Sequence, residues 1–251
     1  MKKREKKDRR KKKRKVNLLL KLLIAMAVLA GLYFFASSSY FNVTSFEVTG
    51  NSYYTEEEIL VMGDCKTGGN IFWGSNVGEI KDRLEKDAYM EEVKVKRVLP
   101  NTIRIELTER KQTAAVKYDD NYAIIDNNSL VLRKSSVAPH LPVIQGLTIS
   151  KLEVGQTLEV EENVRFRQVM EIIDVMEGYD MYFKMIEISE SDVKAYVFDN
   201  LMCQGSPGDL IDAMEKGELQ KVIKNLIDEK IERGTLKISG NSYISFSPEI
   251  D

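Results

Sequence analysis

The feature that most constrains this chain is an apolar stretch that runs from Val16 to Ala36 with Lys21 as its only charge. An α-helix rises about 1.5 Å per residue, so roughly 20 apolar residues cross a bilayer core of about 30 Å. Lys21 lies about one turn inside the stretch, where its long stem can reach the lipid headgroups. Tyr33, Phe34 and Phe35 stand at the other end, where an interfacial aromatic belt is expected. The stretch is therefore predicted to be a transmembrane helix.

The charge that precedes this stretch predicts its orientation. Residues 1–15, MKKREKKDRRKKKRK, hold 12 basic and 2 acidic side chains, a charge of +10. The rest of the chain has 25 basic and 37 acidic residues out of totals of 37 and 39, a charge of −12. A basic run can bind nucleic acid, act as a localisation signal or flank a membrane on its cytoplasmic side. Because an apolar span follows directly, the positive-inside rule predicts that residues 37–251 lie outside the cytoplasm, and lipid attraction accounts for the basic charge without nucleic acid.

A cleaved secretory signal is the alternative interpretation of the same stretch. The apolar region of such a signal usually has about 7 to 15 residues and ends in small residues. The segment Ala36-Ser37-Ser38 would permit cleavage, but the apolar stretch is long. Its length favours an uncleaved anchor over a signal peptide.

Residues that usually carry chemistry are scarce. The one histidine, His140, stands in a loop-like segment, so a histidine-based triad would have to be built on it. The segment 205–209, GSPGD, lacks the Gly-Lys-Ser/Thr end of a phosphate loop and is better interpreted as the start of a helix. The pair Glu161-Glu162 could serve acid/base work on glycans, but surface solvation is the default. Cys65 and Cys203 could form a disulfide in an exported chain, although two small buried or partly buried side chains are favoured. We expect no enzyme, metal site or cofactor.

The residues after the apolar stretch predict a small and well-defined module. Phe46 and Val48 alternate with polar neighbours, as one face of a strand requires, and Gly50-Asn51 is a turn signal. Thr55 is placed to cap a helix, with Glu58 three residues later completing a capping box.

A second helix and a hairpin are expected to complete this module. The helix is predicted over about Ser75–Lys86, with Ser75 as its cap. A Pro100-Asn101 turn then separates two alternating runs, which predict a hairpin with one buried face. The apolar positions of that face are Val93, Val95, Ile103, Ile105 and Leu107. The order is strand, helix, helix, strand, strand within about 70 residues.

Several segments carry a specific resemblance. GNSYYTEEEI at 50–59, GGNIF at 68–72 and RVLPNTIRIELTER at 97–110, in this order of elements, resemble a POTRA domain, a small sheet that carries two helices. YAIIDNNSLVL at 122–132 and LPVIQGL at 141–147 resemble the hairpin and the Leu-Pro-x-Ile-x-Gly step that follow it in the FtsQ/DivIB family of bacterial division proteins. The family often has an aromatic residue where Leu99 stands and a proline after the Glu-Arg pair, where this chain reads Lys111-Gln112-Thr113. Both departures lie in motifs that determine the fold, so they weaken no inference about chemistry.

The resemblance implies an α+β fold class with a single N-terminal transmembrane helix, a POTRA domain and a second mixed α+β domain. The expected boundaries are a basic cytoplasmic tail at 1–15, the transmembrane helix at 16–36, the POTRA domain at 37–112 and an FtsQ-type β domain at 113–251.

The resemblance also implies a function. The protein would be a bitopic scaffold of the divisome that docks FtsB/DivIC-like and FtsL-like proteins outside the membrane and supports septum formation. It would be a single-pass type II membrane protein enriched at the division septum, without a small-molecule substrate. The alternative function is that of a POTRA-type chaperone or transport-associated protein.

The second module reads as α+β from its own residues. Strands are expected over 115–118 and 122–125, which flank an Asp-Asp-Asn turn, and near 185–188 and 193–198. One amphipathic helix is predicted around 164–176 from Val164, Val169, Ile172, Ile173 and Met176, and a longer one over Leu219–Ile231.

Two closing strands, with apolar residues Leu236 and Ile238 in the first, are predicted around a Gly240-Asn241 turn. The last strand, with Tyr243, Ile244, Ser245 and Phe246, is the candidate partner-binding segment. It would either fill the core or offer a free sheet edge, and the resemblance implies the second role.

Overall fold

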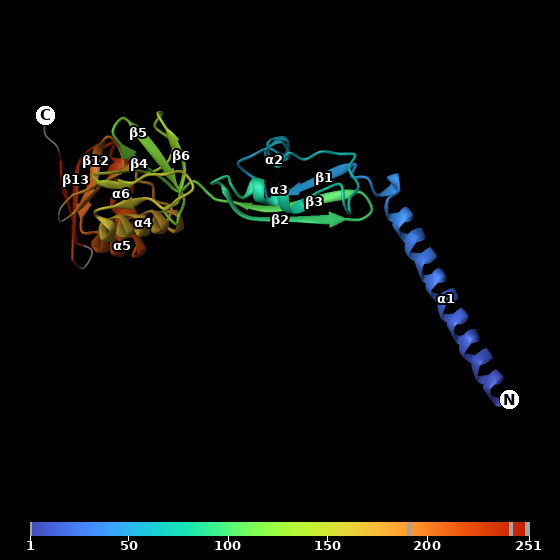
Figure 1. Cartoon of the computed structure of the whole chain (residues 1–251). Helices are drawn as coiled ribbons and strands as arrows, with labels where there is room; N and C mark the ends of the chain where they lie inside the picture. Colours follow the sequence, from blue (N-terminus) through green and yellow to red (C-terminus); the bar gives the residue numbers. More distant parts are fainter. Residues whose placement is uncertain (1, 190–191, 241–242, 249–251) are drawn as a thin grey trace. The chain divides into compact units, whose positions relative to one another are not determined.

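The structure, a computed structural model, describes residues 2–189, 192–240 and 243–248 (Figure 1). The chain divides into two compact units, each described by itself. The first comprises residues 1–85 and 92–108, and the second comprises residues 86–91 and 109–251. The predicted class is confirmed, since the chain mixes helices and sheets and begins with one apolar helix.

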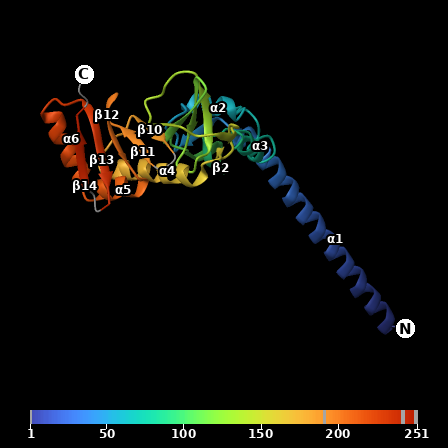
Figure 2. The ribbon, with the colours of Figure 1, turned by 90° about the vertical axis from the view of Figure 1, so that its left-hand side faces the viewer.

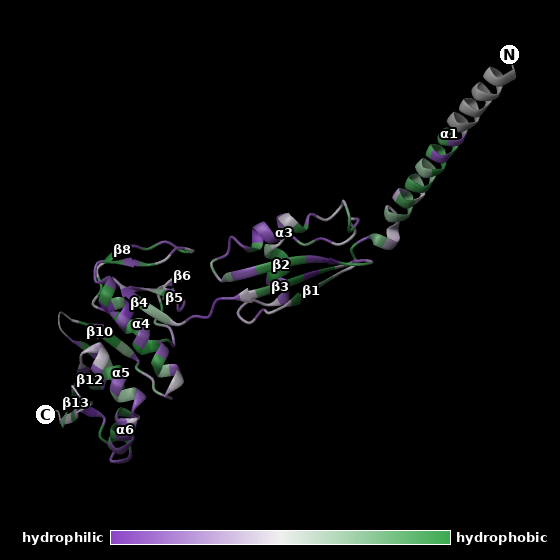
Figure 3. Cartoon of the chain, turned by 90° about the horizontal axis from the view of Figure 1, so that it is seen from below, coloured by the Kyte–Doolittle hydropathy of each residue, from purple (hydrophilic) through white to green (hydrophobic). Residues whose placement is uncertain are grey.

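Helix α1, Lys2–Ala36, opens the first unit. Its segment Asn17–Ala36 is the one helical stretch of the described residues that is long and apolar enough to cross a membrane. Hydrophobic colour predominates along this part of the helix in Figure 3, and none of it is buried within the protein. The segment agrees with the predicted span to within one residue.

The rest of the first unit is a three-stranded sheet with two short helices, in the predicted order. The strand order is β1-β3-β2, and β1 pairs in parallel with β3, from Ser45 opposite Thr102 to Thr49 opposite Glu106. The elements are the 3-10 turn η1 (Ser39–Phe41), β1 (Ser45–Thr49), α2 (Glu56–Met62), α3 (Val77–Leu84), β2 (Met90–Val98) and β3 (Thr102–Glu109).

Each of the two helices begins at a residue whose side chain accepts a hydrogen bond from a backbone N–H of the first turn. The predicted capping box is confirmed, since Thr55 Oγ1 accepts a hydrogen bond from the Glu58 N–H at 3.3 Å and the Glu58 carboxylate accepts one from the Thr55 N–H at 2.9 Å. The predicted cap of the next helix was wrong by one residue. Asn76 caps α3 in place of Ser75, because its side chain accepts from the Glu79 N–H, and the helix is shorter than Ser75–Lys86.

The hairpin has the predicted inward face. Ile103, Ile105 and Leu107 are buried and so is Val93, whereas Val95 is only half-buried. Arg104 lies on the opposite face of β3, where its guanidinium pairs with Glu47 of β1 at 2.8 Å. The turn contains a cis Leu99–Pro100 peptide bond.

The second unit is built on a mixed sheet that has nine strands in the described residues, in the order β14-β13-β12-β11-β10-β7-β4-β5-β6. The pairs β4–β7, β7–β10 and β12–β13 are parallel, and the other neighbouring pairs are antiparallel. The strands are β4 (Ala114–Tyr118), β5 (Asn121–Ile125), β6 (Val131–Ser135), β7 (Val143–Gln145), β10 (Met185–Ile188), β11 (Val193–Tyr196), β12 (Asn200–Gly205), β13 (Arg233–Ser239) and β14 (Tyr243–Ser247), and a separate hairpin is formed by β8 (Ile149–Lys151) and β9 (Glu159–Val160).

Three helices, α4 (Asn163–Gly178), α5 (Pro207–Glu215) and α6 (Glu218–Asp228), share one hydrophobic core with one face of this sheet (Figure 2). GSPGD begins α5 as predicted, with Ser206 as the cap and Pro207 in the first turn.

Two predictions for this unit were wrong. Val164 is exposed, because the buried face of α4 begins at Phe166. The last helix ends at Asp228 and Ile231 lies beyond it, because Lys230 adopts a left-handed backbone conformation. Strands β7, β8, β9 and β12 were not predicted. Asn241 of the predicted turn lies outside the described residues.

Candidate functional site: an open sheet edge

Strand β14 forms one end of the large sheet and has β13 as its only strand neighbour in the part of the chain that the structure describes. The pairing is antiparallel, from Tyr243 opposite Ser239 to Ser247 opposite Thr235. An edge strand directs a row of backbone N–H and C=O groups away from its single neighbour, which leaves them available to another chain.

The side chains of β14 alternate between two environments, as predicted. Ile244 and Phe246 lie opposite the buried Ile238 and Leu236 and pack against the core. Tyr243, on the other face, is 68% exposed. The predicted candidate residues are therefore brought together on one short strand, but only alternate side chains turn away from the core. Both roles weighed from the sequence, filling the core and offering an edge, are compatible with this placement.

Phe246 fixes β14 against its neighbour through a glycine that the sequence pattern did not single out. A Cβ atom at Gly234 would lie 2.6 Å from Cε2 of the Phe246 ring, so the ring occupies the space that a side chain would need. Gly234 also has a positive φ of 137°, which other residues rarely adopt. A glycine inside a strand is a signal of close approach, and it could have indicated this contact.

The opposite edge of the sheet is partly covered. The N–H of Val131, the first residue of β6, donates to the Gln156 carbonyl at 2.9 Å, and the Val131 carbonyl accepts from the Gly155 N–H at 2.8 Å. Leu130, just before β6, forms a further isolated bridge with Thr157. The segment around β8 and β9 thus satisfies backbone groups at the start of β6, so β14 is the more open of the two edges.

The face of the sheet that turns away from the helices carries polar side chains, both in the middle of the sheet at β10 and β11 and beside β14. The Tyr196 hydroxyl donates to Glu187 at 3.2 Å, and burial, followed by the nearby Glu187 carboxylate, raises the Tyr196 pKa. Lys237 of β13 stands opposite Ser245 in the ladder. A partner that reaches this face would meet hydrogen-bonding groups rather than a continuous apolar patch.

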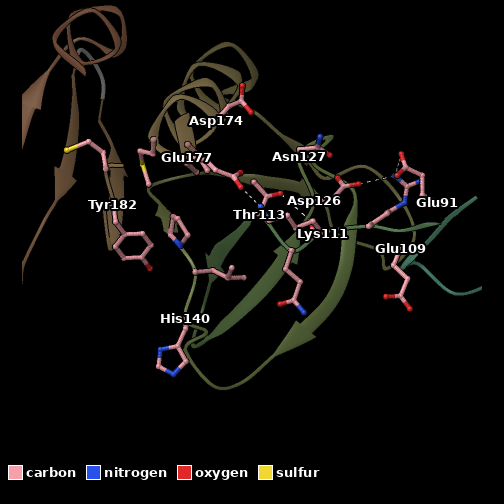
Figure 4. Close-up of a pocket in the computed structure, with 17 residues that line it drawn as sticks. Glu91, Glu109, Lys111, Thr113, Asp126, Asn127, His140, Asp174, Glu177 and Tyr182 are labelled. Atoms are coloured by element: carbon pink, nitrogen blue, oxygen red, sulfur yellow. Dashed lines mark hydrogen bonds and ion pairs between the residues drawn. The ribbon is translucent and has the colours of Figure 1, made fainter. Parts of the chain in front are cut away.

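The second unit also contains a hollow beside α4 (Figure 4). Asp174 and Glu177 of α4 line it, together with His140 and Tyr182. His140 lies on an exposed loop, and Glu177 forms an ion pair with Lys111.

Asp126, the buried carboxylate of this hollow, has a structural role. Its Oδ1 accepts hydrogen bonds from the N–H groups of Asn128 at 2.9 Å and Leu130 at 2.8 Å, and its Oδ2 accepts from Arg110 at 3.0 Å. These bonds hold the turn between β5 and β6, so the carboxylate is fully engaged.

The Glu161-Glu162 pair and the two cysteines belong to different elements of the fold. The Glu162 carboxylate accepts from the N–H and hydroxyl of Thr148 at 2.8 and 2.9 Å, which closes the β8–β9 hairpin, while Glu161 is exposed. Both cysteines are free. Burial raises the pKa of the Cys65 thiol to about 11 and that of the Cys203 thiol to about 12.

The amino-acid sequence is similar to those of known proteins. The model of the FtsQ-type POTRA domain family matches residues 41–110. The cell division protein DivIB of Clostridium acetobutylicum is 29% identical over 196 residues, which cover 76% of this chain and 78% of that protein. The cell division protein FtsQ of Syntrophotalea carbinolica is 28% identical over 171 residues, covering 67% of this chain and 58% of that protein. The chain is therefore similar to DivIB and FtsQ cell division proteins over most of its length, with an FtsQ-type POTRA domain at residues 41–110.

A solved structure adds little to this assignment. The major extracytoplasmic domain of DivIB from Geobacillus stearothermophilus matches with a TM-score of 0.30 and 14% identity, covering 45% of this chain and 97% of that one.

The similarity to these cell division proteins indicates the general function of the chain. The chain is a membrane-anchored protein of the bacterial division machinery, a role that implies interactions with other division proteins. The alternative of a POTRA-type chaperone or transport protein is not favoured, because the matched relatives are named as cell division proteins. The first unit without α1 is accordingly named the POTRA domain, and the second unit is named the β domain.

Proposed function

We propose that this protein is a single-pass type II scaffold of the divisome, enriched at the septum. Residues 1–15 would lie in the cytoplasm, and the POTRA and β domains would lie outside it. The β domain would dock an extended segment of an FtsB/DivIC-like bitopic protein, and an FtsL-like protein would join through that partner. The charge of +10 before the apolar helix and the cell division relatives support this proposal.

The observation that carries the docking role is the edge of β14 that faces no other strand of the described residues. A peptide that adds to a sheet edge gains affinity from main-chain hydrogen bonds and specificity from alternate side chains. On β14 these alternate positions differ in character, since Ile244 and Phe246 border the core whereas Tyr243 and Ser245 border the polar face. A partner strand with apolar residues at every second position would match this arrangement.

The same proposal assigns the protein a binding function without catalysis or a cofactor. His140 lies on an exposed loop, and the Asp126 carboxylate is used by three hydrogen bonds within the fold. Both thiols have raised pKa values, which disfavours the thiolate that nucleophilic chemistry needs.

Protease protection tests the orientation. Protease added to intact spheroplasts should degrade the POTRA and β domains and leave a fragment of the size of residues 1–36. Full protection of both domains would refute the orientation. Fluorescence imaging of the full chain should show it at midcell, and a uniform distribution around the membrane would contradict septal enrichment.

A backbone change on β14 tests the docking role. Ser245→Pro removes one N–H of the edge strand while it leaves Ile244 and Phe246 in place. The purified protein should keep its circular dichroism spectrum and lose the FtsB/DivIC-like partner in a pull-down. A folded variant that still binds would overturn the docking site.

A matched pair of backbone changes makes the test sharper. In an antiparallel ladder, successive residues direct their N–H groups to opposite sides of the strand. We would therefore methylate the backbone nitrogen of Ile244 in one semisynthetic protein and that of Ser245 in another, which preserves both side chains. One of the two should weaken the β13–β14 ladder, and the other should keep the fold and lose the partner. Unchanged partner affinity in both would refute strand addition.

A further inference from the structure

The POTRA domain carries an aromatic loop that is hydrogen-bonded to the end of the membrane helix. The loop is GGNIFWG, residues 68–74. The Asn70 side-chain amide donates to the carbonyl oxygen of Ala36, the last residue of α1, at 2.8 Å. The Ile71 N–H donates to the Phe41 carbonyl at 2.8 Å, a few residues after the helix. These two bonds place the loop at the point where the chain leaves the apolar span.

The loop is firmly built, which distinguishes it from an ordinary connecting segment. A Cβ atom at Gly74 would lie 2.4 Å from the Asn70 nitrogen, so the loop folds closely on itself only because this residue is glycine. Asn70 Oδ1 accepts from the Phe72 N–H at 3.0 Å. Arg97 of β2 donates to the Ile71 carbonyl at 2.6 Å. The backbone that presents the aromatic side chains is thus fixed from within and from the sheet.

The side chains of this loop divide between the core and the solvent. Ile71 is fully buried, whereas Phe72 is 36% exposed and Trp73 is 58% exposed. A large aromatic side chain that a rigid loop holds in solvent is uncommon and indicates an interaction surface. Tyr40, in the connector just before the POTRA domain, is also exposed, at 63%.

These rings form one cluster with the aromatic end of the membrane helix. The Trp73 ring stacks on Tyr33 of α1, with ring centroids 5.7 Å apart. Phe41 contacts Phe35 of α1 and Phe72 of the loop, each with a centroid separation of 5.2 Å. The aromatic belt predicted for the helix therefore continues into the POTRA domain.

We propose that this cluster, Tyr33, Phe35, Tyr40, Phe72 and Trp73, seats the POTRA domain in the headgroup layer of the membrane that α1 crosses. A helix of 20 residues, Asn17–Ala36, spans about 30 Å, which matches the hydrocarbon core and brings Ala36 to its boundary. A group that is hydrogen-bonded to Ala36 then lies in the interfacial layer. Tyrosine and tryptophan favour this layer, because an apolar ring and a polar N–H or O–H group are both accommodated there.

The proposal commits to lipid rather than to a partner protein because the cluster is continuous with a surface that lipid already covers. The exposed rings begin on the apolar helix itself and extend to the loop through ring contacts. The inference rests on α1 crossing the membrane and is independent of the docking site on β14. Its consequence is that the POTRA domain is held at the bilayer surface by its own side chains in addition to its covalent link.

The chain offers a direct probe, because Trp73 is its only tryptophan. The full chain would be reconstituted in nanodiscs of phosphatidylcholine and phosphatidylglycerol, once with ordinary acyl chains and once with chains brominated near the headgroup. Trp73 emission should be blue-shifted, lose most of its intensity in the brominated discs and resist quenching by aqueous iodide. Emission typical of water-exposed indole, unaffected by bromine, would overturn the proposal and leave a partner protein as the occupant.

A matched variant controls for indiscriminate contact with lipid. In Trp73→Phe/Tyr53→Trp the single tryptophan moves beyond the other end of β1, whose five residues rise about 3.3 Å each. Its emission should be insensitive to brominated lipid and quenched by iodide. If brominated lipid quenched the tryptophan emission equally at positions 73 and 53, the proposal that only one end of the domain contacts the membrane would be wrong. Co-elution of each protein with the discs shows that α1 has inserted, so failure of the anchor is distinguished from failure of the seat.

Discussion

Replacement of Ile105 by alanine is the sharpest test of how the POTRA domain is held together. Ile105 is fully buried on β3, the central strand of its sheet, with β1 on one side and β2 on the other. Alanine removes three carbon atoms, which corresponds to about 2.4 kcal/mol of lost burial at about 0.8 kcal/mol per carbon. A residual cavity on the order of 50 Å³ adds about 1 kcal/mol, because neighbouring strands limit collapse.

The expected loss of about 3–4 kcal/mol is large for this domain. A domain of about 70 residues has a free energy of unfolding of about 4–10 kcal/mol, so Ile105→Ala should leave it marginally stable. Ile105→Asp should prevent folding, because it adds a buried charge without a partner. Urea unfolding of the full chain in detergent micelles, followed by Trp73 fluorescence, measures this domain specifically since the tryptophan lies within it.

The matched control is the neighbouring residue on the opposite face. Arg104→Gln breaks the ion pair with Glu47, but both side chains are about half-exposed, and such pairs contribute at most about 1 kcal/mol. The midpoint for Arg104→Gln should therefore lie close to that of the unmodified chain, far above that of Ile105→Ala. Equal losses in the two variants would mean that β3 presents the other face to the core, and the assigned register would be refuted.

Three further predictions concern other parts of the chain. Asp126→Ala should destabilise the β domain by about 3–5 kcal/mol in urea unfolding, because it removes the buried carboxylate that accepts from Arg110 and from two turn N–H groups and leaves Arg110 only the longer ion pair with the half-exposed Glu91 at 3.8 Å; a loss below about 1 kcal/mol would contradict this role. Hydrogen bonds from the Thr55 N–H and hydroxyl lower the pKa of Glu58. The ionised Glu58 carboxylate should therefore stabilise the POTRA domain above the ordinary glutamate pKa, and this stabilisation should be lost as the pH falls through the lowered pKa. If POTRA stability had the same acid dependence in Glu58→Gln as in the unmodified chain, this prediction would be wrong. Cys203 should resist iodoacetamide until the chain is unfolded, because it is fully buried and burial raises its pKa to about 12, and rapid alkylation of the folded protein, detected by mass spectrometry, would show that β12 opens.

The sequence predicted the elements that are set by local patterns. The apolar span, the capping box at Thr55 and Glu58 and the two faces of the POTRA hairpin follow from composition, spacing and alternation, and the structure confirms them. The end of the last helix was missed because it depends on the left-handed backbone of Lys230, which no propensity marks. Asn76 replaced Ser75 as a cap because two adjacent residues were both suitable.

The candidate site was predictable only in part. Alternation along Tyr243–Ser247 identified which side chains face the core, but not that the strand lies at the end of the sheet. That position depends on parallel pairings between strands distant in sequence, such as β12 with β13 across two helices. The aromatic seat was visible in sequence only at its helical end, because the bond between Asn70 and Ala36 joins residues 34 apart.

The parallel pairing of β1 with β3 has a mechanical consequence. The chain enters β1 from α1 at one end of the strand pair and leaves β3 for the β domain at the other end, so a pull between α1 and the β domain acts on opposite ends of two adjacent strands. Tension of this kind shears the ladder and stretches all of its hydrogen bonds together, from the pair at Ser45 to the pair at Thr49, whereas peeling would break them one at a time. Because forced unfolding is governed by the height of the unfolding barrier, the POTRA domain should resist extension when force is applied along the chain between α1 and the β domain.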